Sequence, residues 1–468
     1  MNRMKITVNV LVSVLVLFVS ACTCYAQNVP VPVRAPAAVK GTTDDMLNPG
    51  FWVSRIDEPE RVVMSIDDIE SLNEKNAARI IPDTHPYAEN IAQIEKDGPI
   101  FNVADPLSFQ SPFPSDDVKK RLQTNNDRLL NGEFYDNWAL TLTDDKKSEY
   151  ITAANIENLQ NRIVPKTGMI VRHTTARLFP TAEPAYRMRG YLDDNSVTSL
   201  DIGMPVAVMH RSGSGDYLFV LSPIAWGWVS AEDIAFGSSK LIRQYRENKN
   251  IIISVCHRTP VYSNKTGDIF YGWLYLGERL NLISETDDFY CVSAPFREMD
   301  GSLGFNGVWV KKSDDVNSGY LPYTKKNAIE TAFRILGRPY GWHDSWDERD
   351  CGGIMRVIFN CFGFRLPRYW SFEQLCSDHA EYVGDSEDVE SKSAELAGFP
   401  AGITFTGTTG HIGLYLGHVD GKPYGIHQCG WNYTDDGVEY KMARVVVTDY
   451  INIGFNMKNM QYFTPMVP

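Results

Sequence analysis

The sequence predicts a multidomain chain in which a mostly helical or irregular N-terminal domain and two small β-barrels precede an α+β domain. Two stretches, 163–234 and 251–323, consist of short β-rich runs separated by turns. Both end in a similar strand, "GWV" at 227–229 and "VWV" at 308–310. The region after residue 323 instead mixes helical and strand periodicity. A chain of 468 residues is long enough for roughly three or four domains.

The charge balance argues against a nucleic-acid partner. The formal net charge is −13 at pH 7, and the chain has no basic run. Phosphate backbones bind basic surfaces, so the acidity is better explained by solubility.

The N-terminus predicts export. Arg3 and Lys5 precede an apolar run that ends at Ala21, which is too short to span a membrane, and 1–21 therefore reads as a signal peptide. Two cleavage sites compete. "VSAC" at 19–22 would leave a lipidated Cys22, and "CYA" at 24–26 would suit ordinary signal peptidase. We favour lipidation of Cys22.

The segment 22–50 is predicted to be an extended tether because it contains Pro30, Pro32 and Pro36 among small residues. Thr23 supplies no acidic retention signal, so the outer membrane is expected in a Gram-negative host. We thus expect a protein of the cell envelope or periplasm that touches the membrane through its lipid anchor only. A monomer is expected.

Export also affects how the eight cysteines are interpreted. Disulfides form in oxidising compartments, and Cys256 and Cys291 are the most plausible pair because they share one β-rich segment. The chain has no CxxC pair and no His/Cys cluster with zinc spacing. We therefore predict neither a metal nor a cofactor.

The remaining domain boundaries are placed where the composition and the residue pattern change. Residues 51–160 form the N-terminal stabilising domain, where Ser65 is a helix N-cap with Asp68 three positions later. The first barrel covers 161–238 and the second 248–322. Tyr217, Trp226 and Trp228 could be exposed binding aromatics, but tryptophan in a small barrel is more often core. The α+β domain covers 323–468.

Two helices are predicted at the start of the α+β domain. In "KKNAIETAFRILG", apolar residues recur at helical spacing and Gly337 ends the run. In "RDCGGIMRVIFNCFGF", Asp350 is the N-cap and Gly363 the stop. One buried face is predicted, made of Ile354, Val357, Ile358 and Cys361.

Cys351 is placed in the first turn of this second helix. The positive end of the helix dipole favours a thiolate there, although Asp350 opposes it. Gly352 and Gly353 cost about 1 kcal/mol each in a helix interior, which suggests that something approaches the backbone closely. A purely structural cysteine fits the same pattern, so a reactive Cys351 also requires a base.

A hairpin at 410–431 offers that base. His411 and His427 lie on its two predicted strands, joined near "VDG" at 419–421. A three-residue loop that pairs His418 with Lys422 places His427 and His411 on one face, whereas a two-residue loop would turn His427 to the core face. With the first register, one histidine can act as base and the other can orient it.

These motifs resemble the NlpC-type cell-wall endopeptidases, which are papain-like cysteine peptidases. The family carries "PYxWGG", "DCSG", "LPRxS" and "GHxGxYxG"; here the corresponding segments are 339–344, 350–353, 366–371 and 410–417. The two barrels then resemble bacterial SH3-like domains, and the resemblance covers nearly all of the mature chain. It implies a papain-like fold for the C-terminal domain.

The resemblance implies roles for seven residues. The catalytic residues would be Cys351 as nucleophile, His411 as general base and His427 as the orienting residue. Substrate would contact Tyr340 at the oxyanion site, together with Asp350, Gly352 and Ser371 along the cleft. The implied substrates are peptidoglycan stem peptides or muropeptides cut after γ-D-glutamate at meso-diaminopimelate or Lys. The first SH3-like domain would help to select a free N-terminal L-Ala, with Asp193, Asp194 or Asp216 available for the ammonium group.

Three departures from the family pattern touch the expected cleft. Gly352 replaces serine, His343 and Asp344 replace two glycines, and one extra residue precedes Ser371. Two other functions therefore stay open: a cell-wall-binding protein with a weakened or inactive catalytic domain, and a cysteine amidase or acyltransferase of the same fold.

Overall fold

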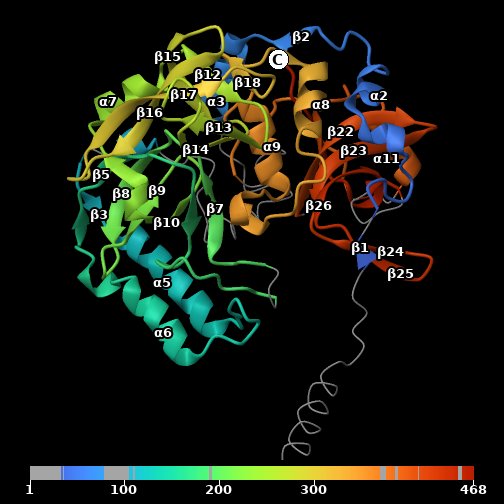
Figure 1. Ribbon diagram of the computed structural model, residues 1–468. Coiled ribbons are helices and arrows are strands. Elements are labelled where there is room, and N and C mark those ends of the chain that lie inside the picture. Colours follow the sequence, from blue (N-terminus) through green and yellow to red (C-terminus); the bar gives the residue numbers. More distant parts are fainter. Residues whose placement is uncertain are drawn as a thin grey trace, which may run out of the picture. The chain divides into compact units, whose positions relative to one another are not determined.

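Figure 1 shows the computed structural model of the chain. The structure describes residues 33–34, 36–77, 105–108, 111–188, 192–368, 376–384, 388–408, 410–451 and 456–468. The predicted signal peptide, Cys22 and Ser371 lie outside these residues. These described residues form two compact units, one made of 33–34 and 36 with 431–442, and one made of the described parts of 37–430 and 443–468.

The smaller unit is a three-stranded sheet in the order β1-β25-β24. Its strands are β1 (Val33–Arg34), β24 (Asn432–Asp435) and β25 (Val438–Lys441). β1 runs parallel to β25, and β24 and β25 form an antiparallel hairpin.

The N-terminal part of the larger unit is helical. It contains η1 (Asp44–Leu47), α2 (Pro49–Val53), β2 (Val62–Met64) and α3 (Ile66–Ala77). The predicted cap of α3 is confirmed, because Ser65 Oγ accepts from Asp68 N at 3.2 Å and Ser65 N donates to the Asp68 carboxylate at 3.1 Å. The tether expected over 22–50 does not extend through its last residues: Met46 is buried in the same core cluster as Ile354 and Ile412.

The next part joins this helical region to the first sheet. It contains η2 (Pro106–Ser108), β3 (Phe113–Pro114), α5 (Asp116–Asn131), α6 (Asp144–Ala153), η3 (Ile156–Asn158) and β4 (Arg162–Ile163). Val118 and Leu122 of α5 are buried against Trp228 and Phe219 of the first sheet. Trp228 is therefore core, as predicted, and Tyr217 and Trp226 are half-buried beside it.

Sheet I has seven strands in the order β11-β5-β8-β9-β10-β6-β7. The strands are β5 (Lys166–Ile170), β6 (Thr174–Arg177), β7 (Ser196–Leu200), β8 (Pro205–Arg211), β9 (Tyr217–Leu221), β10 (Trp226–Ser230) and β11 (Ile234–Phe236), with η4 (Ala231–Asp233) before the last. All its described pairings are antiparallel, and it encloses an aliphatic core of its own.

Sheet II also has seven strands, in the order β14-β13-β17-β16-β15-β12-β18, and follows α7 (Ser239–Arg246). Its strands are β12 (Ile251–Ser254), β13 (Arg258–Tyr262), β14 (Phe270–Tyr275), β15 (Arg279–Glu285), β16 (Phe289–Arg297), β17 (Leu303–Lys311) and β18 (Val316–Ser318). Its core is again aliphatic and separate from that of sheet I.

The predicted Cys256–Cys291 disulfide is wrong, because both cysteines are reduced. Cys291 lies on β16, Cys256 follows β12, and β15 separates these two strands in the sheet. Neighbouring strands are about 4.8 Å apart, so strands two positions apart exceed the Cα separation of about 7 Å that a disulfide tolerates.

The C-terminal part contains two central helices and a six-stranded sheet. The first elements are β19 (Tyr323–Thr324), α8 (Lys325–Phe333), η5 (Trp342–Asp347), α9 (Cys351–Asn360) and α11 (Val389–Leu396). Sheet III has the order β20-β27-β21-β22-β23-β26. Its strands are β20 (Glu381–Tyr382), β21 (Thr404–Thr408), β22 (His411–Val419), β23 (Lys422–Cys429), β26 (Arg444–Asp449) and β27 (Tyr462–Pro465), with η6 (Met457–Asn459) before the last.

The apolar face of α9 is as predicted. Ile354, Val357, Ile358 and Cys361 are each 2% exposed or less. They pack between Ile253, Val255 and Leu276 of the sheet II region and Ile412, Leu414 and Ile426 of sheet III. Figure 1 shows α9, in orange, beside β22 and β23, which it contacts.

The predicted register of the β22–β23 hairpin is wrong, although its consequence holds. Val419 pairs with Lys422, so the loop has only two residues, Asp420 and Gly421, with φ of 49° and 74°. Positive φ at both positions is typical of a type I′ turn. A β-bulge at Leu416, between the Tyr415 and Gly417 pairings, then adds one residue to β22 and restores the relation of the two histidines.

Among the described residues, no helix combines the length and the apolar character that a membrane crossing requires.

Candidate active site

Cys351 is the first residue of α9 and is 8% exposed. Asp350 caps the helix, as predicted, because its carboxylate accepts from Gly353 N at 2.9 Å. The remaining first-turn N–H groups surround the thiol with positive backbone dipoles. A side chain at this position can therefore act on a carbonyl that is polarised by the same helix end.

His411 and His427 are directly bonded to each other. His411 Nε2 lies 2.9 Å from His427 Nδ1, and His427 Nε2 lies 2.9 Å from Thr448 Oγ1 on β26. If His411 donates its Nε2 proton to His427, its Nδ1 keeps a lone pair that can accept a proton. Because β22 and β23 pack against α9, the helix that begins with Cys351 contacts both strands that carry the histidines.

Burial keeps both histidines neutral. His411 is 2% exposed and His427 is fully buried. Burial, with a smaller contribution from His427, holds the pKa of His411 well below its usual value, and burial lowers the pKa of His427 to about 3. A neutral imidazole is the form that a general base requires at neutral pH.

We expect this burial to make the fold acid-sensitive. Below pH 6.5 the unfolded chain protonates both histidines while the folded chain does not, so stability falls as pH drops through this range towards about 3 for His427. Each such histidine contributes a slope of about 1.4 kcal/mol per pH unit. In urea unfolding experiments between pH 7 and pH 4, the free energy of unfolding of His427→Gln should fall less steeply with decreasing pH than that of the wild type. His379→Gln, at an exposed histidine, is the control; equal slopes for His427→Gln and the wild type would contradict the expectation.

Three other predicted site residues, Tyr340, Gly352 and Asp350, are half-buried or buried. The ring of Tyr340 is half-buried and packs over Gly430, and its backbone N donates to Ala443 O at 2.8 Å. Gly352 lies in the first turn of α9 and is buried. Asp350 is 6% exposed and its carboxylate is bonded to Arg368 at 2.7 Å, so little of it faces solvent.

The segment before α9 has an unusual backbone. His343, Asp344, Trp346 and Asp347 all have φ between 51° and 60°. Residues other than glycine pay about 1 kcal/mol or more in this left-handed region. The glycines that the family resemblance places at 343 and 344 would fit the same backbone. The side chains present here must therefore be held by contacts.

The side chain of Asp344 is held against the first turn of α9. It is fully buried, and a Cβ added at Gly353 would overlap Asp344 Oδ1. Arg368 Nε lies 3.3 Å from Asp344 Oδ2. Burial raises the pKa of Asp344, but the guanidinium groups of Arg368 and two other arginines outweigh it, so the pKa lies well below its usual value.

This close fit predicts that substitutions at positions 353 and 344 have coupled effects on stability. Gly353→Ala should destabilise the protein by about 1–3 kcal/mol, because the added methyl group meets a buried carboxylate. In the Asp344→Gly background, Gly353→Ala should cost little stability, because the carboxylate oxygen that the new methyl group would overlap is removed. Urea unfolding of the two single variants and the double variant measures the coupling. Additive destabilisation in the double variant would contradict the predicted contact.

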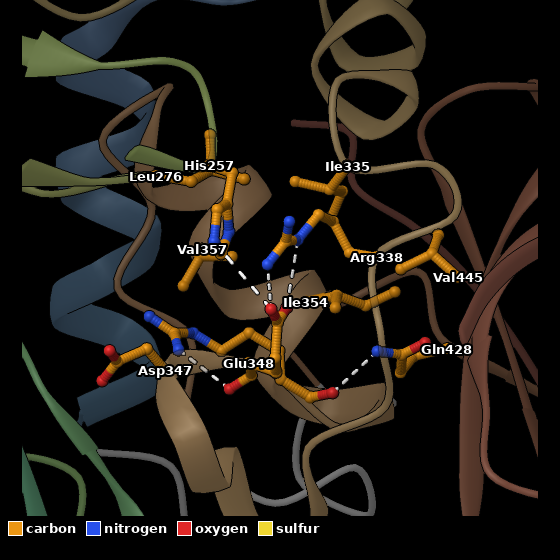
Figure 2. Close-up of a pocket in the computed structure, with 11 residues that line it drawn as sticks. His257, Leu276, Ile335, Arg338, Asp347, Glu348, Ile354, Val357, Gln428 and Val445 are labelled. Atoms are coloured by element: carbon orange, nitrogen blue, oxygen red, sulfur yellow. Dashed lines mark hydrogen bonds and ion pairs between the residues drawn. The ribbon is translucent and has the colours of Figure 1, made fainter. Parts of the chain in front are cut away.

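A second cluster holds the same segment from the side of sheet II. Figure 2 shows Arg338 and His257 directed at the carboxylate of Glu348, which lies 3.2 Å from Arg338 Nε and 4.0 Å from His257 Nε2. The pocket around them has about 320 Å³ not filled by atoms, part of it open to solvent. Burial and the neighbouring arginines lower the pKa of His257 to about 4.

Gln428 closes this cluster from sheet III. Its side chain donates to Arg349 O at 2.9 Å and to Pro339 O at 2.7 Å. The three residues that precede Cys351 are thus fixed through side chains or carbonyls from several elements.

Two of the three acidic residues proposed for an ammonium group are already engaged. Asp194 is 1% exposed and accepts from Arg128 and Arg187 at 2.8 Å each and from Trp342 Nε1 at 3.1 Å. Asp193 is buried and accepts two backbone N–H groups at 3.0 Å. Asp216 is exposed in the β8–β9 turn. Asp193 and Asp194 therefore serve the turns and the contact with η5.

A further group of polar side chains joins sheets I and II. Ligand-type atoms of His173, Asp201 and Glu278 lie within 4.8 Å of one another. Glu278 accepts from His173 Nδ1 at 2.7 Å and from Tyr275 N at 2.8 Å, and Asp201 accepts from Arg356 at 2.7 Å. Each of the three side chains is thus bonded to at least one other side chain.

Comparison with known proteins supports this architecture. Residues 190–230 match the family described as SH3 domain (SH3b1 type). An NlpC/P60 endopeptidase from Photobacterium damselae subsp. piscicida is similar in structure, with a TM-score of 0.68 and 16% identity over 93% of this chain and 99% of that chain. This chain has the fold of an NlpC/P60 endopeptidase.

Two other comparisons add less. An NlpC/P60 family protein from Bacillus cereus ATCC 10987 matches with a TM-score of 0.43 and 15% identity, over 64% of this chain and 100% of that chain. A search of the curated proteins found no match.

Sequence reasoning gave no role in the site to three residues that the structure brings to the predicted site residues. Thr448, Asp344 and Arg368 are buried polar residues bonded to predicted site residues. The departure from glycine at 344 was a usable signal. Thr448 gave none, because a threonine in the β-rich run 444–449 is ordinary.

Proposed function

We propose that the protein is a cysteine endopeptidase of peptidoglycan stem peptides. The observation that carries this proposal is the bond from His411 to His427 on strands that pack against the helix beginning with Cys351. The overall similarity to an NlpC/P60 endopeptidase adds fold-level support. The proposed bond is the amide between γ-D-glutamate and meso-diaminopimelate or Lys.

In the proposed reaction, His411 Nδ1 accepts the thiol proton and Cys351 Sγ attacks the carbonyl carbon after γ-D-glutamate. First-turn N–H groups of α9 stabilise the oxyanion. His411 then gives its proton to the leaving amine, which leaves a thioester on Cys351. Water, deprotonated by His411, attacks the thioester and releases the peptide acid. His427, held by Thr448, keeps the His411 ring in one orientation.

Defined peptides test this function. The purified protein would be incubated with L-Ala-γ-D-Glu-meso-diaminopimelate, with the same peptide N-acetylated, and with the Lys analogue. We expect L-Ala-γ-D-Glu and a free diamino acid by mass spectrometry. Binding without products would instead indicate a cell-wall-binding protein. If an amine added to the reaction becomes covalently attached to the peptide, the protein is an acyltransferase.

We also propose that the protein acts in the cell envelope as a lipoprotein. The sequence "VSAC" at 19–22 follows an apolar run, and the matched SH3 domain is of a bacterial type. Cys22→Ala should release the protein from the membrane fraction, while Cys24→Ala, two residues away, should not. Mass spectrometry should find two or three acyl chains on Cys22. A mature chain that starts at Gln27 would contradict the anchor.

A further inference from the structure

Asp344 connects sheet I with the start of the nucleophile helix. Its Oδ2 accepts from Thr198 Oγ1 at 2.9 Å and from Ser199 Oγ at 3.4 Å, and both residues lie on β7. Its Oδ1 accepts from Asp350 N at 3.4 Å. One buried carboxylate thus touches the β7 strand and the residue that caps α9.

Arg368 completes the connection. Its Nε donates to Thr198 Oγ1 at 2.7 Å, and its terminal nitrogen donates to Asp350 Oδ2 at 2.7 Å. Asp350 is therefore fixed at its backbone by Asp344 and at its carboxylate by Arg368. Both of these residues are in turn bonded to Thr198.

The strained backbone around Asp344 agrees with a positioning role. Asp344 has φ of 60° and lies where an added Cβ of Gly353 would be. A side chain kept in the left-handed region must be over-determined by its surroundings, and such sites cluster where geometry matters for function. The carboxylate meets the first turn of α9 and not its middle.

A second ion pair joins the same sheet and the same helix elsewhere. Arg356, in the second turn of α9, is bonded to Asp201 at 2.7 Å. Asp201 immediately follows β7. Docking of α9 on sheet I therefore has a support that does not involve the N-cap, which makes Asp201 a matched comparison for Asp344.

We propose that Asp344 is a positioning residue through which β7 of sheet I fixes the N-cap of the nucleophile helix. The first SH3-type module is then part of the apparatus that aims Cys351, in addition to any contact it makes with substrate. The proposal rests on the proposed function, since it takes Cys351 as the nucleophile.

Asp344→Asn and Thr198→Val test the proposal, with Asp201→Asn as control. Both test variants should lower kcat on the stem peptide about tenfold with little change in KM, because a small misplacement of a reacting group reduces the chemical step. The fold-decrease in kcat of the double variant should be smaller than the product of the two single fold-decreases, because the two side chains share one hydrogen bond. Asp201→Asn should stay within about twofold of the wild type.

A second readout does not need turnover. The pH dependence of Cys351 alkylation by iodoacetamide, followed by peptide mass spectrometry, reports the field at the helix start. The charged and titratable groups that interact with Asp344 or with the N-cap region are Asp350, Asp201, Arg349, Arg356, Arg368 and His343. Asp344→Asn removes a negative charge, so the midpoint should move about one pH unit lower. Thr198→Val changes no charge and should leave the midpoint in place.

Three outcomes would overturn the proposal. The first is that both test variants, measured below their unfolding temperatures, have the kcat of the wild type. The second is that Asp201→Asn loses as much kcat as they do. The third is that Asp344→Asn leaves the alkylation midpoint unchanged. If the wild type cleaves no stem peptide, the proposed function fails and the alkylation experiment alone decides on Asp344. Should Asp344→Asn not fold, Thr198→Val alone decides on kcat.

Discussion

Cys351→Ala is expected to reduce hydrolysis of stem peptides by about 10⁴-fold or more. No other nucleophile can form the proposed thioester once the sulfur is lost. The effect should be confined to chemistry, because the side chain is small and sits at the first residue of α9. Its thermal unfolding and its affinity for the peptide should stay close to those of the wild type.

The matched control for this variant is Cys256→Ala. Cys256 is a half-buried cysteine after β12, and burial raises the pKa of its thiol. Its Sγ contacts Arg258 O and Thr259 Oγ1, at 3.3 Å each, in the sheet II region. We expect activity to be retained. Turnover by Cys351→Ala close to the wild-type rate would rule out Cys351 as the nucleophile.

Local signals in the sequence predicted the helix that carries Cys351. The cap by Asp350, the apolar face of α9 and the capping box at Ser65 and Asp68 each depend on residues within about one or two turns. Such contacts follow from spacing alone. The division into β-rich segments was also visible, because turns and strands alternate regularly along 163–323.

The contacts that complete the site are not local. Asp344 meets Thr198 across 146 positions of sequence, and Arg368 meets the same residue across 170. The hairpin register depended on a bulge at Leu416, which no residue pattern announced. The loop length was therefore predicted wrongly, and the relation between His411 and His427 came out as expected because the bulge offsets the shorter loop.

His411→Ala is expected to abolish turnover to nearly the same extent as Cys351→Ala, because the proton acceptor and donor are lost together. His427→Ala should cost less, about 10²-fold, since the base remains but its ring is no longer held at 2.9 Å by a partner. His418→Gln is the control on the same strand; His418 is bonded to Ser393 and Tyr415 and takes no part in the pair.

The pH profile distinguishes orientation from a direct role of His427 as base. Burial, and then the proximity of His427, hold the pKa of His411 low, so the acid limb of kcat/KM in the wild type should lie below pH 6.5. His427→Ala removes the second cause and admits water, which should move this limb to higher pH. If His427→Ala instead abolished turnover while His411→Ala kept a measurable rate, His427 would be the base and the order of the two histidines would be reversed.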